Sequence, residues 1–193
     1  MRPIFLHQES IFALLRELSH RQVTLFLCAV CQRQMGVYCE YVSGHPWDNR
    51  SELRSILNTC WHVSVFNENY EAIIEPEMTD FLDVDFNQSS SRFAIDAFSS
   101  IWHLTRWIVS KDECSIAGPV ENAFSILDGY IYELVAQTEV TAQNDLMVDQ
   151  HQLVQQEIHR QNLQLQRVSS LGWGSENWRS FQAEVEGETL LSA

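Results

Sequence analysis

Three polar side chains within residues 92–110 have the types and the spacing of a possible site. Asp96, Ser100 and His103 follow one another at intervals of four and three residues, which aligns them on one face of a helix, and Trp102 is adjacent in sequence. A carboxylate, a hydroxyl and an imidazole are the groups of nucleophilic catalysis. A catalytic triad, however, needs the His between the other two groups, usually with partners from separate elements. The pattern therefore indicates a candidate ligand-binding site and leaves any catalytic residue unknown.

Asp96 is the strongest single candidate in the chain. It lies in a strongly apolar segment, so we expect its carboxylate to be partly buried. A buried carboxylate must find hydrogen bonds or a cation, or its pKa rises. Two interpretations stay open: a structural polar contact, for example with Arg106 or a helix terminus, and a role in a ligand site.

The pair Cys28-x-x-Cys31 has the spacing of a redox or metal motif. In redox proteins such a pair opens a helix after a strand, where the helix dipole lowers the thiol pKa. Here the pair falls well inside an expected helix. Zinc would need further ligands at matching spacing, and the sequence has no second Cys-x-x-Cys and no pair of His at zinc-ligand spacing. We predict two small side chains packed in the core.

Other metal and phosphate motifs are incomplete or missing. Di-iron bundles need Glu-x-x-His on each of two helices, and Glu17 to His20 is the sole match. His151 and His159 are expected on a solvated helix surface. Glycine-rich phosphate loops are absent from the sequence. We therefore expect no metal and no cofactor, and the lack of a recognisable catalytic motif favours a protein that is not an enzyme.

The charge distribution is strongly one-sided. From Lys111 to Arg160 there are nine acidic residues and no base between them, and the whole chain carries a net charge of −14. This charge disfavours nucleic acid, whose binding needs Lys and Arg at the phosphates, and it disfavours anionic membranes. It suits a basic protein partner or simple solubility. Five cysteines, no apolar run of about 18 residues and no signal-peptide pattern favour the cytoplasm.

Apolar residues recur at helical spacing along the chain, and strand alternation of useful length does not occur. We predict an all-α single-domain bundle of about six or seven helices over residues 1–170, followed by a tail or short docked helix over 171–193. Residues 21–42 and 92–110 are apolar on more than one face, so they are expected to be two central buried helices. The remaining helices are expected at 11–18, 49–66, 118–138, 143–169 and 175–187.

Two of these segments resemble a known family. Residues 21–33 resemble the early helix of the YjaG-like bacterial family of unknown function, and Ala94-Ile95-Asp96-Ala97 is similar to its central segment. The likeness covers roughly residues 5–169. It implies an all-helical cytoplasmic domain, and it supplies no activity, cofactor or catalytic residue.

Three functions follow from these patterns. The first is an interaction or inhibitor-like module that binds a basic protein partner through the acids of 68–85 and 112–157. The second is a small-ligand-binding protein or an unrecognised enzyme with a pocket near Asp96, His103 and Trp102. The third is a homodimer whose seam is the Gln-rich helix 143–169, and it is compatible with either of the others. The raised pKa of a carboxylate beside a cavity would favour the second.

Overall fold

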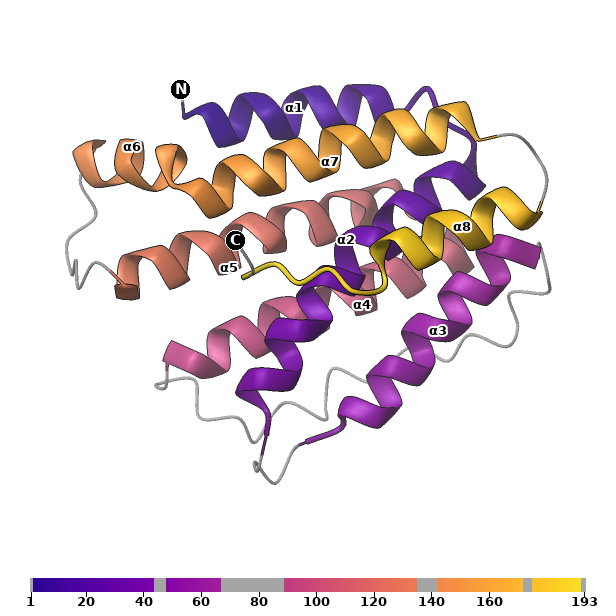
Figure 1. The fold of residues 1–193 in the computed structure, drawn as a ribbon, viewed down its shortest axis with the longest axis horizontal. Helices are drawn as coiled ribbons and strands as arrows, with labels where there is room; N and C mark the ends of the chain where they lie inside the picture. The colour runs from indigo at the N-terminus through magenta and orange to yellow at the C-terminus, as the bar shows by residue number, and fades with distance from the viewer. Residues whose placement is uncertain (1, 44–47, 67–88, 135–141, 172–174, 192–193) are drawn as a thin grey trace.

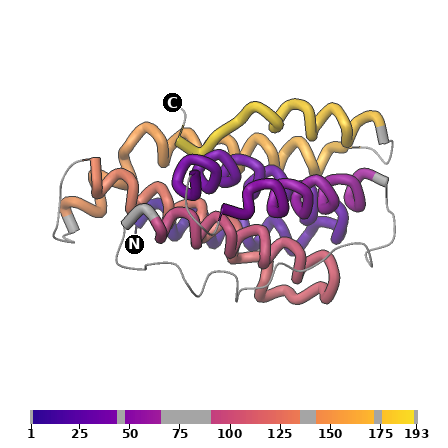
Figure 2. The backbone as a smooth tube through the Cα atoms, turned by 90° about the horizontal axis from the view of Figure 1, so that it is seen from below, coloured from indigo at the N-terminus to yellow at the C-terminus, as the bar shows by residue number. Residues whose placement is uncertain are grey.

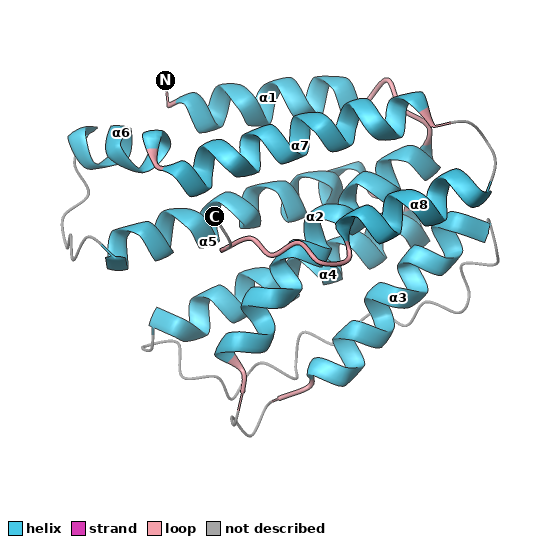
Figure 3. Cartoon of the chain, viewed as in Figure 1, coloured by secondary structure: helices cyan, strands magenta, loops and turns pink. Residues whose placement is uncertain are grey.

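The computed structural model describes residues 2–43, 48–66, 89–134, 142–171 and 175–191, and the regular structure in these ranges is entirely helical (Figure 3). The all-α prediction is confirmed. The helices are α1 (Pro3–Leu15), α2 (His20–Tyr41), α3 (Arg50–Phe66), α4 (Ser89–Ser110), α5 (Ala117–Leu134), α6 (Ala142–Gln150), α7 (Gln152–Ser170) and α8 (Ser175–Val185), with a short 3-10 helix η3 (Glu113–Ile116) before α5.

The predicted number of six or seven helices is wrong, because the described residues form eight α-helices. The segment 143–169, expected to be one helix, is divided at His151. The backbone of His151 is extended (φ −64°, ψ 142°), and its Nδ1 accepts a hydrogen bond from the amide of Leu153 at 3.3 Å. A side chain that caps the next helix ends the previous one, and His gives little sign of this in sequence. The first helix also begins earlier, at Pro3, where proline suits the first turn.

Helix α2 lies at the centre of the molecule. A capping box of Ser19 and Gln22 starts the helix, and residues 23–31 are all buried. It contacts α3, α4, α5, α7 and α8. Figure 2 shows α2 in a middle layer, between α4 on one side and α8 on the other. Helices α1 and α7 lie side by side (Figure 1), and both pack against α5. Polar groups on α2 can therefore reach side chains from most of the chain.

The C-terminal segment packs onto this core. Trp178, Phe181 and Val185 of α8 are buried, and the rings of Phe181 and Trp61 pack edge to face at 6.0 Å. Beyond α8, the amide of Leu190 donates to the carbonyl of Arg33 at 3.2 Å. These contacts anchor residues 175–191 against α2 and α3.

The acid-rich stretch 68–85, the first part of the predicted interaction surface, lies outside the residues that the structure describes. Among the helices that the structure describes, none has the length and apolarity needed to cross a membrane.

Candidate functional site

Asp96 points from α4 toward α5, where it meets the hydroxyl of Ser125. The Ser125 Oγ donates a hydrogen bond of 2.8 Å to Asp96 Oδ2. Burial raises the pKa of Asp96, while this hydrogen bond and the positive charge of Arg92 oppose the rise. The guanidinium of Arg92 also lies 3.4 Å from Ser125 Oγ. Asp96 is thus a half-buried carboxylate that fixes the orientation of a neighbouring hydroxyl.

A cavity of about 370 Å³ opens at Ser125 between α1, α4 and α5. Its wall combines aromatic and aliphatic side chains with charged and amide groups: Arg2, Ile4, Phe5, Gln8, Arg92, Glu121, Phe124, Ser125 and Asp128. Most of these residues are polar or charged, so the wall is more polar than that of a typical ligand pocket and offers several groups that set the orientation of a ligand. The position of Ser125 makes Asp96 the carboxylate behind this cavity.

Ser100 does not line that cavity. It belongs to a buried network of hydrogen bonds. Its Oγ lies 2.7 Å from Gln34 Oε1 and accepts a hydrogen bond of 3.1 Å from Asn122 Nδ2. Gln34 in turn donates to the carbonyl of Pro119 at 2.8 Å. Ser100 and Gln34 are fully buried, so this network joins α2, α4 and α5 inside the core.

His103 and Trp102 meet at the start of α5. Their rings pack edge to face at 4.9 Å, and the guanidinium of Arg106 lies 5.0 Å above the Trp102 ring. Burial, together with the charge of Arg106, lowers the pKa of His103. Its Nδ1 is buried and has no hydrogen-bond partner among the described residues. The His103 ring rests directly on Gly118, whose missing side chain makes room for it.

The four candidate residues therefore lie in three different environments and do not form one site. Asp96 contacts Ser125, Ser100 contacts Gln34, and Trp102 and His103 pack together near Gly118. Helical spacing aligned the backbones of Asp96, Ser100 and His103, but the neighbouring helices engage each side chain separately.

Cys28 and Cys31 are completely buried in α2. Burial raises the pKa of both thiols well above the ordinary value, and it raises that of nearby Cys60 to about 12. Such thiols stay protonated and are poor nucleophiles. Packing accounts for this pair, as the sequence predicts.

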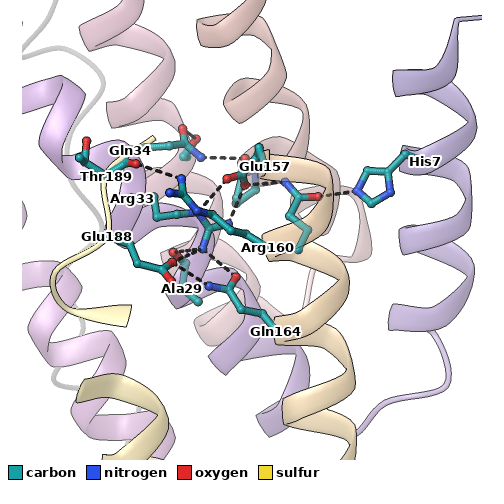
Figure 4. Close-up of polar contacts among 12 residues, drawn as sticks. His7, Ala29, Arg33, Gln34, Glu157, Arg160, Gln164, Glu188 and Thr189 are labelled. Carbon is teal, nitrogen blue, oxygen red and sulfur yellow. Dashed lines mark hydrogen bonds and ion pairs between the residues drawn. The ribbon is translucent and has the colours of Figure 1, made fainter. Parts of the chain in front are cut away.

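A buried polar cluster that sequence reasoning missed surrounds Arg33 in α2 (Figure 4). Arg33 Nη2 and Nε donate to the two carboxylate oxygens of Glu157 at 2.6 and 2.9 Å. Arg33 Nη1 donates to Gln164 Oε1 at 2.7 Å, and Gln161 Nε2 donates to Glu157 at 2.9 Å. His7 of α1 continues the cluster through a 3.0 Å contact with Gln161. The available signal was an Arg in the middle of the apolar segment 21–42.

A second cluster surrounds Arg2. Its guanidinium donates to Asp128 and Asp149, each at 2.7 Å, and lies 3.5 Å from Asp145. Asp149 is buried, as is Glu157. Four of the nine acids between Lys111 and Arg160 are thus engaged by Arg2 or Arg33. The acids of 112–157 do not all face solvent.

The profile of one protein family, "Protein of unknown function (DUF416)", matches residues 10–178. The chain belongs to the DUF416 family. The predicted resemblance to a family of unknown function is thereby confirmed, and the name YjaG-like stays a prediction.

A solved structure of another member of this family has a similar fold. The DUF416 chain is similar to a crystal structure, at 1.91 Å resolution, of a DUF416 family protein from Shewanella baltica OS155. The TM-score is 0.75 and the sequence identity 21%, over 94% of this chain and 96% of that one. At this identity the likeness shows a shared fold. No curated protein matches the DUF416 chain.

Proposed function

We propose that this chain is a small-molecule-binding protein whose ligand occupies the cavity between α1, α4 and α5. The observation that supports this most strongly is the hydroxyl of Ser125 on the cavity wall, held 2.8 Å from the half-buried carboxylate of Asp96. A group with a raised pKa beside a cavity is a common feature of functional sites.

The wall chemistry suggests the class of ligand. The Ser125 proton points to Asp96 and its oxygen accepts one hydrogen bond from Arg92 at 3.4 Å, so the second acceptor position of this oxygen is left for a ligand. Glu121 offers a second acceptor, whereas Arg92 offers a cation for an acidic group. Phe5 and Phe124 supply apolar surface. We therefore propose an amphipathic amino or hydroxy acid, with its carboxylate at Arg92 and its donor group near Ser125 and Glu121.

An acidic docking surface for a basic protein is the second function that we considered. The net charge of −14 favours it. Against it, Asp149 and Glu157 are buried, and Asp128 and Asp145 contact Arg2. The ligand-binding proposal has the more specific support.

Self-association through residues 143–169 is compatible with either function. Leu146 and Met147 on α6 and Leu163 on α7 are exposed apolar side chains, which supports a homodimer seam there. Light scattering of the wild type and of Leu163→Glu would test the seam, because a charge at this position should dissociate a dimer. A monomeric wild type would contradict it.

A thermal-shift screen with the standard amino acids and the corresponding 2-hydroxy acids would test the ligand site. The variants Ser125→Ala and Arg92→Gln each remove one polar group from the cavity wall. Ser55→Ala and Arg54→Gln on α3 are matched controls, because both positions are exposed and do not line this cavity.

We expect at least one compound to raise the melting temperature of the wild type and of both control variants. The same compound should have a much smaller effect on the two cavity variants. The proposal is wrong if no compound stabilises the wild type, or if the cavity variants respond as the controls do.

A further inference from the structure

A second cavity, of about 290 Å³, lies between α7 and the C-terminal segment. It shares no lining residue with the cavity at Ser125. Helix α7 contributes Arg160, Gln164 and Arg167 to its wall, while α8 and the residues after it contribute Phe181, Glu184 and Glu188. Two arginines in one small cavity are notable, since the whole chain has 12 basic residues against 26 acidic ones.

Glu188 makes a weak contact at the inner end of this cavity. It lies 3.4 Å from Arg33 Nη1, but the guanidinium of Arg33 is already paired through two shorter hydrogen bonds with Glu157. The Glu188 side chain is 31% exposed, whereas those of Arg33 and Glu157 are 0% and 1% exposed. Glu188 is therefore a second, replaceable carboxylate on a buried cation.

The backbone around Glu188 places this carboxylate in the cavity. Gln164 Nε2 donates to Glu188 at 3.2 Å, Arg160 donates to the carbonyl of Thr189 at 3.2 Å, and the amide of Leu190 donates to the carbonyl of Arg33 at 3.2 Å. Figure 4 shows Glu188 directed toward Arg33 and Gln164. Single hydrogen bonds from Gln164 and Arg33 hold the Glu188 carboxylate, so a competing anion can displace this side chain at modest cost.

We propose that this cavity is a binding site for the carboxylate or phosphate group of a small molecule, which takes the place of Glu188 at Arg33 and Gln164. When Glu188 leaves, three arginines (33, 160 and 167) and two glutamates (157 and 184) remain around the site. The site then has one net positive charge, which attracts an anion. The Glu188 side chain acts as an internal competitor, and its displacement reports ligand binding.

Calorimetric titration with citrate and with inorganic phosphate tests the proposal, with chloride at equal ionic strength as the screening control. Glu188→Gln removes the competing charge. Glu186→Gln, two residues away and exposed, removes the same charge outside the cavity and is the matched control. Arg167→Gln weakens the site from the side of α7.

We expect citrate or phosphate to bind Glu188→Gln about fivefold more tightly than the wild type, the size of one partly exposed charge pair. Glu186→Gln should bind like the wild type, and Arg167→Gln more weakly. A preference for citrate identifies a carboxylate ligand, and a preference for phosphate identifies a phosphorylated one.

Hydrogen exchange gives a second readout on the unmodified chain. The Leu190 amide should exchange faster when the preferred anion binds, because the displaced Glu188 side chain no longer helps to hold the neighbouring backbone that donates to Arg33. Equal affinity in Glu188→Gln and Glu186→Gln, or an unchanged exchange rate at Leu190, would overturn the proposal.

Discussion

The guanidinium of Arg33 in α2 and the carboxylate of Glu157 in α7 form a two-point ion pair that is closed to solvent, with distances of 2.6 and 2.9 Å. The two residues are 124 positions apart in sequence. Gln161 and Gln164 from the next turns of α7, and the carbonyl of Ala29, add further hydrogen bonds to the pair. Additional hydrogen bonds of this kind make a buried charge pair tolerable in a core.

Removing one member of this pair should be strongly destabilising. We expect Glu157→Ala to lower the free energy of unfolding by about 3–5 kcal/mol, because the buried charge of Arg33 would keep only the weaker contact with the partly exposed Glu188. The double variant Arg33→Met, Glu157→Leu should lose much less, since no buried charge remains. Urea unfolding measures both, and urea is preferred because it does not screen charges.

Glu184→Ala is the matched control for that experiment. Glu184 pairs with Arg167 at 3.1 Å, but the two side chains are 51% and 45% exposed. Its loss should cost less than about 1 kcal/mol. Equal costs for Glu157→Ala and Glu184→Ala would show that burial does not set the strength of the Arg33–Glu157 pair.

The stability of Asp96→Asn relative to the wild type should depend on pH. Since burial raises the folded-state pKa of Asp96, the folded protein holds this proton more tightly than the unfolded chain does. The resulting stability is fully present below the unfolded pKa of about 3.9 and is lost as pH rises through the folded value. The amide of the Asp96→Asn variant keeps an acceptor for Ser125 and cannot ionise.

Urea unfolding from acidic to neutral pH would measure this effect. We expect Asp96→Asn to gain stability relative to the wild type as pH rises, by less than about 1 kcal/mol because Asp96 is only partly buried. Glu133→Gln, at an exposed position on α5, controls for the change in net charge. A difference between Asp96→Asn and the wild type that does not vary with pH would contradict the burial of this carboxylate.

Gly118→Ala should destabilise the protein even though alanine favours helix. A Cβ at position 118 would lie 2.2 Å from Cδ2 of His103, so the imidazole must move. Overpacking of this kind costs about 1–3 kcal/mol, against a helix-propensity gain of up to about 1 kcal/mol. Adding His103→Ala should recover most of the loss, and thermal unfolding of the two single variants and the double variant measures the coupling. Additive effects would show that the two residues are not in contact.

Helical periodicity predicted much of the fold because the apolar pattern of each helix is local. The segments 21–42 and 49–66 correspond closely to α2 and α3, and the apolar residues Trp178, Phe181 and Val185 of the last segment are buried. The break at His151 was missed because it depends on one side chain capping a backbone amide. The start of α4 at Ser89 was missed for a related reason, since a Ser-Ser-Ser run indicates a loop by composition.

The sequence by itself determined that the chain is helical, acidic and free of the familiar catalytic and phosphate-binding motifs, because those properties depend on composition and on spacing within one segment. Only the tertiary structure decided which polar groups meet. Asp96 faces Ser125, Arg33 pairs with Glu157, and Glu188 returns to Arg33 from the end of the chain. Each contact joins separate elements, and no local periodicity records the packing that brings them together.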